Sequence, residues 1–176
     1  MGEVAASCKR GALCYSVYLS TTSDEDLSLV KSDAFSFEKV SKSDETDDLG
    51  DMDNSEEAQL LRLLSHRNCW YLMGKHGGCS CHFRHDGSLD LPEGYRGQIP
   101  SFGPPEDWAP EDEEDIDSTR AVYDWLISML SEGHSIDLVD WWSSSNLNEI
   151  QTFDVKLRDV PSDHFRFFGN GIFKLS

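Results

Sequence analysis

The sequence predicts an α+β fold: a largely antiparallel sheet of hairpins with two helices packed on one face. Short apolar runs that alternate with polar residues outnumber helical patterns, and Gly- and Asn-containing turn signals separate several of them. The regular strand–helix–strand alternation that is typical of a parallel sheet is missing. A chain of 176 residues suits a single domain over 1–176, which buries about 70% of its unfolded surface.

The predicted order of elements is β-β-α-β-β-α-β-β-β-β. From alternation and composition, strands are expected at 13–20, 34–40, 68–75, 79–85, 136–142, 151–159, 165–168 and 172–175. Turn signals predict that the third and fourth strands pair as a hairpin, and that the last two do the same. Asn54 is expected to cap the first helix, whose short apolar stripe follows at Leu60, Leu61 and Leu64.

The second helix, expected at 119–132, has the clearest helical pattern. Val122, Leu126 and Met129 recur at helical spacing around Trp125, and Gly133 supplies a stop signal. We therefore expect Trp125 to be largely buried against the sheet as the anchor of this apolar stripe.

The net charge of -18 comes almost entirely from two segments. Residues 44–57 and 106–117 each contain eight carboxylates and no Lys or Arg, so the rest of the chain has 17 acids against 15 bases. The first segment belongs to a flexible acidic loop expected at about 41–54, and the second ends a long Pro/Gly/acidic connection at about 86–117. The acidity is thus added to a near-neutral globular body.

Several classes of protein fit this composition poorly. A general nucleic-acid binder needs a basic surface, and the strongly negative net charge disfavours one. The negative charge also disfavours docking to an anionic membrane through a basic patch. No apolar run approaches the ~20 residues that a membrane span needs. The first residues lack the apolar region of a signal peptide, so we expect a cytoplasmic protein with free thiols at its five cysteines.

The two acidic segments predict different roles. A run of charged residues is usually a solvated loop. Residues 44–57 contain neither an aromatic residue nor a proline to fix the chain, so we expect this segment to be such a loop. The second is stiffened by prolines and is the better candidate surface for capturing a basic protein partner. The candidate partner-binding residues in this segment are Trp108, Glu111, Asp112, Glu113, Glu114 and Asp115.

Cysteine and histidine are concentrated between residues 66 and 85, where zinc or copper could find thiolate and imidazole ligands. If 79–85 is a strand, Cys79, Cys81 and His85 share a face, and His76 lies in the preceding turn. That face also carries Phe83 and, across the hairpin, Trp70 and Leu72, so we favour two buried core cysteines pointing with them into the interior. A metal site at Cys79, Cys81, His85 and His76, or a Cys-x-Cys redox pair, remains the alternative.

No local motif identifies a catalytic nucleophile, a phosphate loop or a cofactor site. The sequence therefore favours a non-enzymatic binding protein without a cofactor, which uses an acidic surface to engage a basic protein. The alternative is a metal- or thiol-dependent protein that uses the Cys/His-rich hairpin around Cys79 and Cys81.

Overall fold

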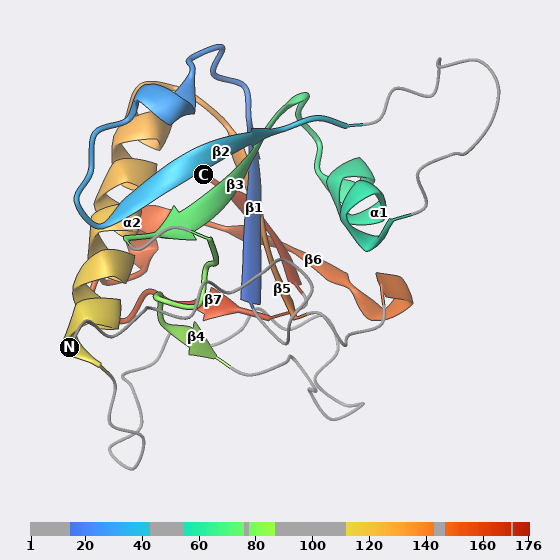
Figure 1. The fold of residues 1–176 in the computed structure, drawn as a ribbon. Helices are drawn as coiled ribbons and strands as arrows, with labels where there is room; N and C mark the ends of the chain where they lie inside the picture. Colours follow the sequence, from blue (N-terminus) through green and yellow to red (C-terminus); the bar gives the residue numbers. More distant parts are fainter. Residues whose placement is uncertain (1–14, 43–54, 76–77, 87–111, 143–146, 170) are drawn as a thin grey trace, which may run out of the picture.

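The computed structural model describes residues 15–42, 55–75, 78–86, 112–142, 147–169 and 171–176. It has the predicted α+β class, with a mixed, mostly antiparallel sheet of six strands and two helices (Figure 1). The described strands and helices follow the predicted order. Their bounds are β1 Tyr15–Thr21, β2 Phe35–Val40, α1 Glu56–Leu63, β3 Asn68–Gly74, β4 His85–Asp86, α2 Glu113–Ser131, β5 Ile136–Trp142, β6 Gln151–Val155, β7 Phe167–Phe168 and β8 Gly171–Leu175, with short 3-10 turns η1 Leu27–Leu29, η3 Leu147–Glu149 and η4 Leu157–Asp159. Within the described ranges, no helix is both long enough and apolar enough to cross a membrane.

The large sheet has the strand order β2-β3-β1-β5-β8-β6, so β1 and β5 occupy its centre. Neighbouring strands are antiparallel except β6, which runs parallel to β8. In the register of the central strands, Leu19 lies opposite Trp70 on one side and opposite Leu138 on the other. A separate two-stranded parallel sheet joins β4 to β7, with His85 opposite Phe167.

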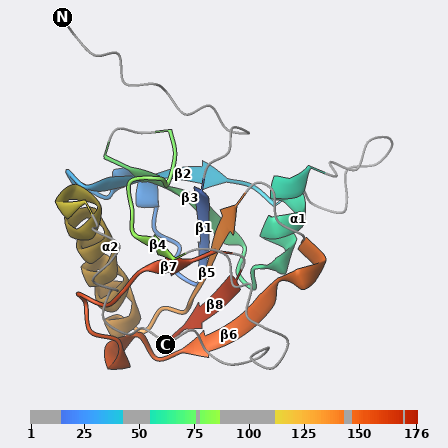
Figure 2. The ribbon, with the colours of Figure 1, turned by 90° about the horizontal axis from the view of Figure 1, so that it is seen from below.

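The two helices lie on opposite faces of the large sheet, so the prediction that both pack on one face is wrong (Figure 2). Val17 and Leu19 of β1 belong to the core that α2 covers, whereas Tyr18, between them, belongs to the core under α1. Both faces of the central strands are apolar, and each face needs its own cover. Leu60 and Leu61 of α1 supply it on the second face.

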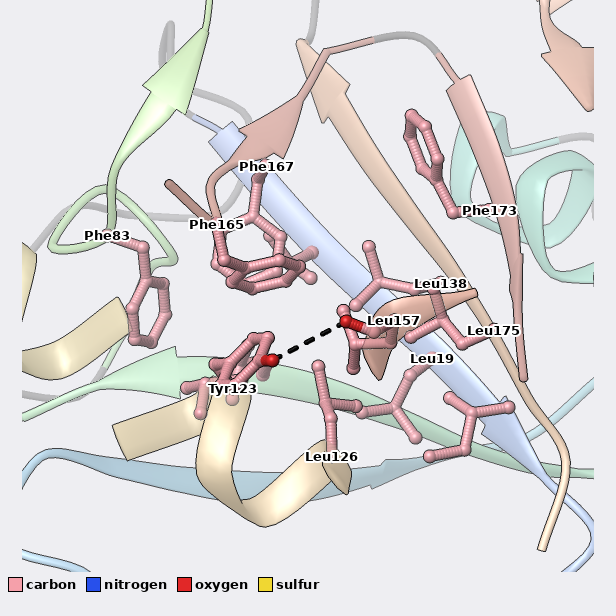
Figure 3. Packing of buried hydrophobic residues seen from close by; sticks show 14 of the residues in the cluster. Leu19, Phe83, Tyr123, Leu126, Leu138, Leu157, Phe165, Phe167, Phe173 and Leu175 are labelled. Atoms are coloured by element: carbon pink, nitrogen blue, oxygen red, sulfur yellow. Dashed lines mark hydrogen bonds between the residues drawn. The ribbon is translucent and has the colours of Figure 1, made fainter. Parts of the chain in front are cut away.

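The larger core lies under α2. Figure 3 shows Phe83, Phe165 and Phe167 gathered beside Tyr123, a buried residue of α2. The rings of Phe83 and Phe167 are 5.5 Å apart between centroids. The Tyr123 hydroxyl donates to the Val160 carbonyl at 2.7 Å, so its polar end is satisfied inside this core.

Neither predicted hairpin forms. β3 pairs with β1 and with β2, and a strand that already has two neighbours cannot take residues 79–85 as a third. Only His85 of that predicted strand is extended, and together with Asp86 it pairs with β7 instead. β8 likewise has β5 and β6 as neighbours, which leaves no edge for the residues of β7.

Both helices begin at a side-chain cap. Ser55 accepts a hydrogen bond from the Ala58 amide, one position after the predicted cap Asn54, which lies outside the described residues. Asp112 caps α2, which therefore starts at Glu113 rather than at 119 as predicted. The end of α2 is close to the prediction, and Gly133 follows it with a φ of 91°.

Trp125 packs against the sheet as predicted, but it is partly rather than largely buried. Its ring contacts the rings of Phe35 and Phe37 in the edge strand β2, with ring centroids 6.3 and 4.7 Å apart. Val122, Leu126 and Met129 are buried as predicted. The apolar stripe of α2 is thus centred on these aliphatic residues, and Trp125 lies at its margin.

Candidate functional site

Residues 78–86 form an irregular segment that is packed against the end of the β1–β3 ladder. The Ser80 hydroxyl accepts a hydrogen bond from the Val17 amide at 2.9 Å and donates one to the Leu72 carbonyl at 2.6 Å. This hydroxyl therefore joins the two strands at the last residue pair of their ladder. The segment also lies so close to Gly74 that a Cβ there would come within 2.8 Å of the His82 Cβ, so Gly74 has to be glycine.

The centre of this segment is a buried His85–Asp140 pair. The Nδ1 atom of His85 lies 2.8 Å from Oδ2 of Asp140, and the two side chains are 5% and 0% exposed. Nε2 of His85 lies 2.6 Å from the Ser80 carbonyl oxygen. Because both neighbours are acceptors and a neutral imidazole has only one N–H, His85 is held as the imidazolium. The Tyr15 ring stacks on it at 3.9 Å and 8°.

The pKa of His85 is raised above its usual value of 6.5. Burial alone favours the neutral ring and lowers the pKa, but the charge and the hydrogen bond of Asp140 outweigh burial. The hydrogen bond to the Ser80 carbonyl and the charge of Asp115 act in the same direction as Asp140. Asp140 Oδ1 is also buried and has no hydrogen-bond partner among the described residues, so His85 is the main compensation for this carboxylate.

This pair predicts a definite pH dependence of stability. Since His85 has a raised pKa in the folded protein, its contribution is complete below about pH 6.5 and is lost as the pH rises through the folded pKa. We expect the free energy of unfolding, measured in urea between pH 5.5 and 8.5, to fall across this range. His85→Gln should remove most of the slope, whereas His134→Gln, a variant of a partly exposed histidine, should retain it. A wild-type slope of the opposite sign, or an equal slope in His85→Gln, would contradict the assignment.

The two cysteines of the segment differ from the prediction in part. Cys79 is buried, as are Trp70, Leu72 and Phe83, but Cys81 is partly exposed. Burial and a hydrogen bond with the Cys79 thiol are the main causes that raise the pKa of Cys81 to about 11. The Cys81 thiol is therefore protonated near neutral pH, which disfavours its use as a nucleophile or in thiol exchange.

The candidate metal ligands are not brought together by the described residues. No group of three or more His, Cys, Asp or Glu side chains in the described ranges is arranged to hold a metal ion. Both ring nitrogens of His85 already face other acceptors, so this residue cannot ligate in the observed arrangement. His76 lies outside the described residues.

The candidate partner-binding residues are divided by the start of α2. Trp108 and Glu111 lie outside the described residues, whereas Glu113–Asp117 are helical and do not belong to the predicted connection. The capping side chain of Asp112 accepts from the Glu114 amide at 2.8 Å. Glu114 pairs with Lys75 at 3.1 Å. Carboxylates in a first helical turn are stabilised by the helix dipole, so part of this acidity has a structural role.

Asp115 faces the segment that holds His85. Partial burial and the neighbouring Asp112 raise the pKa of Asp115, while His82 and His85 lower it. The Thr119 hydroxyl accepts from the Arg84 amide at 2.8 Å and donates to the Asp115 carbonyl. The N-terminal end of α2 is thereby joined to residues 82–85, and Asp115 is unavailable as a freely exposed charge.

Exposed carboxylates remain along the outer face of α2. Glu113, Asp117 and Asp124 are exposed and follow one another at spacings of four and seven residues, which places them on one side of the helix. We call these three residues the α2 acidic stripe. Arg120 pairs with Asp117 at 3.1 Å and is the only basic residue between 112 and 132, a range that contains seven carboxylates.

Asp140 is the residue that the sequence interpretation missed. It occupies the same side of the strand 136–142 as Ile136 and Leu138, and a carboxylate on the core side of an apolar strand needs a partner. This signal could have predicted a buried ion pair, although the alternation alone could not name His85 as the partner. Comparison of the chain with family models, with curated proteins and with solved structures yields no match.

Proposed function

We propose that this is a non-enzymatic binding protein that engages a basic protein partner through the α2 acidic stripe. The observation that carries the proposal is the alignment of Glu113, Asp117 and Asp124 on the exposed side of a long helix. Carboxylates that are arranged on one face attract a basic surface from a distance and orient it on contact. The proposal keeps Glu113 of the candidate surface predicted from the sequence and moves the rest of that surface along the helix to Asp117 and Asp124.

The helix that carries the stripe is firmly attached to the sheet. Val122 and Leu126 are fully buried and Met129 is 3% exposed, so the exposed side of α2 has a fixed orientation. A preformed surface loses less conformational entropy on binding than a flexible one, since ordering a side chain costs about 0.5–1.5 kcal/mol. The fixed helix therefore supports recognition better than an acidic loop of the same charge.

The thiol chemistry of the alternative function receives less support. Cys81 has a raised pKa, and the imidazole of His85 is bonded at both nitrogens within a buried pair. The Cys81 thiol is therefore not activated as a nucleophile, and His85 has no free ring nitrogen with which to act as a base.

Two variants of equal net charge test the proposal. The stripe variant is Glu113→Gln, Asp117→Asn and Asp124→Asn; the control variant neutralises three other exposed carboxylates, Asp33→Asn, Asp154→Asn and Asp159→Asn. We expect affinity capture from a lysate of the source cells at about 150 mM salt to recover a basic protein with wild type and with the control, and to lose it with the stripe variant. If both variants lost the partner equally, net charge alone would explain the binding. If wild type and both variants all recovered the partner, the α2 acidic stripe would be excluded as the binding surface.

A further inference from the structure

A polar groove lies at the end of the large sheet where β1 ends and β3 begins. It has a volume of about 600 Å³ and is open to solvent. Its lining comes from the end of β1, from β2 and from the turn between α1 and β3, and includes Thr22, Lys39, Ser65, Arg67 and Asn68. The groove is separate from the α2 acidic stripe and shares no residue with it.

The walls of the groove are fixed by hydrogen bonds. The Asn68 carboxamide donates to the Ser23 carbonyl at 2.6 Å, which holds the segment after β1 against the start of β3. In the turn before β3, the Ser65 amide donates to Oδ2 of the buried Asp137 at 2.6 Å. The His66 amide donates to the Ser20 hydroxyl at 3.3 Å. The groove therefore exists before any ligand arrives, which is typical of small-molecule sites.

The charge of the lining is opposite to that of the protein. Lys39 and Arg67 line the groove, and neither is within ion-pairing distance of a carboxylate in the described part of the chain. The Lys39 ammonium lies 4.3 Å from the centre of the Trp70 ring, which positions it. Asp24 is the single carboxylate of the described lining. The lining itself carries two cationic side chains against one carboxylate, in a chain with a net charge of -18, while the Asp137 carboxylate is buried behind the Ser65 amide.

We propose that this groove binds a small phosphorylated molecule with a hydroxyl-bearing body, such as a sugar phosphate. The guanidinium of Arg67 and the ammonium of Lys39 are the groups that bind a phosphate. The groove is much larger than a phosphate ion, so the remaining space takes the rest of the ligand. The hydroxyls of Thr22 and Ser65 and the carboxylate of Asp24 present donors and acceptors to a polyhydroxylated body.

A titration of the ¹⁵N-labelled full chain with glucose 6-phosphate, inorganic phosphate and glucose tests this site by nuclear magnetic resonance. We expect saturable shifts of the amides of Ser65, His66 and Arg67 with glucose 6-phosphate, weaker binding of inorganic phosphate, and no shifts with glucose. Arg67→Gln should weaken the binding of glucose 6-phosphate by about tenfold or more. Lys156→Gln removes the same charge at an exposed position outside the groove and should leave the affinity unchanged.

The same spectra report whether each variant is folded, so loss of binding is distinguished from loss of structure. The proposal would be overturned if the shifts did not saturate or were centred outside the groove. It would also be overturned if Arg67→Gln and Lys156→Gln weakened the binding of glucose 6-phosphate equally. Equal affinity for glucose 6-phosphate and inorganic phosphate would reject the hydroxyl-bearing body as part of the ligand.

Discussion

Replacement of Asp140 with alanine is expected to lower the free energy of unfolding by about 3–5 kcal/mol, the range for breaking a buried ion pair by removing one partner. The variant leaves the imidazolium of His85 with 5% exposure and without its counter-ion. Urea denaturation at pH 6, where His85 is charged in the wild type, measures the effect. Asp154→Ala removes an exposed carboxylate from the edge strand β6 and is expected to change stability by no more than about 0.5 kcal/mol.

A double-mutant cycle separates the ion pair from the packing of each side chain. Since Asp140→Ala and His85→Ala each leave the other charge unpaired, the double variant should lose less stability than the sum of the single variants. A loss below about 1 kcal/mol for Asp140→Ala, or additive losses in the cycle, would mean that this pair does not hold residues 78–86 to the sheet.

Replacement of Trp70 with alanine is expected to cost about 3–5 kcal/mol, the range for a large aromatic residue in a core. Trp70 is 1% exposed and lies in β3 between Leu19 of β1 and Lys39 of β2. Its indole N–H has no partner among the described residues, so the cost is one of packing and not of a lost hydrogen bond.

Trp125→Ala is the matched comparison for Trp70. Trp125 is partly exposed at the margin of α2, so its removal should cost less, about 2 kcal/mol. Thermal unfolding of the two variants under one set of conditions gives the order directly. If Trp125→Ala were as destabilising as Trp70→Ala, the sequence prediction of a buried Trp125 would be right and the observed packing of α2 would be wrong.

The sequence predicts the type and order of the described elements better than their contacts. Alternation identifies each strand from its own residues, but it does not say which strands become neighbours. The sequence predicts that a strand at 68–75 pairs with 79–85 in a hairpin, but both edges of the observed strand β3 are taken by β1 and β2. Such long-range pairings depend on how the whole sheet is completed, and the local pattern does not contain that information.

The acidic residues before α2 show a second limit. A dense run of carboxylates indicates a loop, yet Asp112 caps the helix and Glu113, Glu114 and Asp115 form its first turn. The helix dipole and the cap outweigh the repulsion among these side chains. The same misreading extended the candidate partner surface to residues that have structural roles.

The sequence indicates the Cys/His-rich segment of the candidate site but not the partner of His85. The concentration of Cys and His between 66 and 85 directs attention to this segment, but the parity of a strand at 79–85 predicts that Cys81 and His85 face the same core. Because 78–84 is not extended, parity does not apply there. The pairing of His85 with Asp140, 55 residues further along the chain, follows from the fold alone.

We propose that the α2 acidic stripe, and not net charge, recognises a basic partner. Isothermal titration of the captured partner at about 150 mM salt compares wild type with the two variants of equal charge. The stripe variant should bind at least about tenfold more weakly than wild type, while the control variant stays within about twofold, since exposed charges outside an interface change affinity little. Equal affinities for the two variants would contradict the claim, whether both were weakened or neither was.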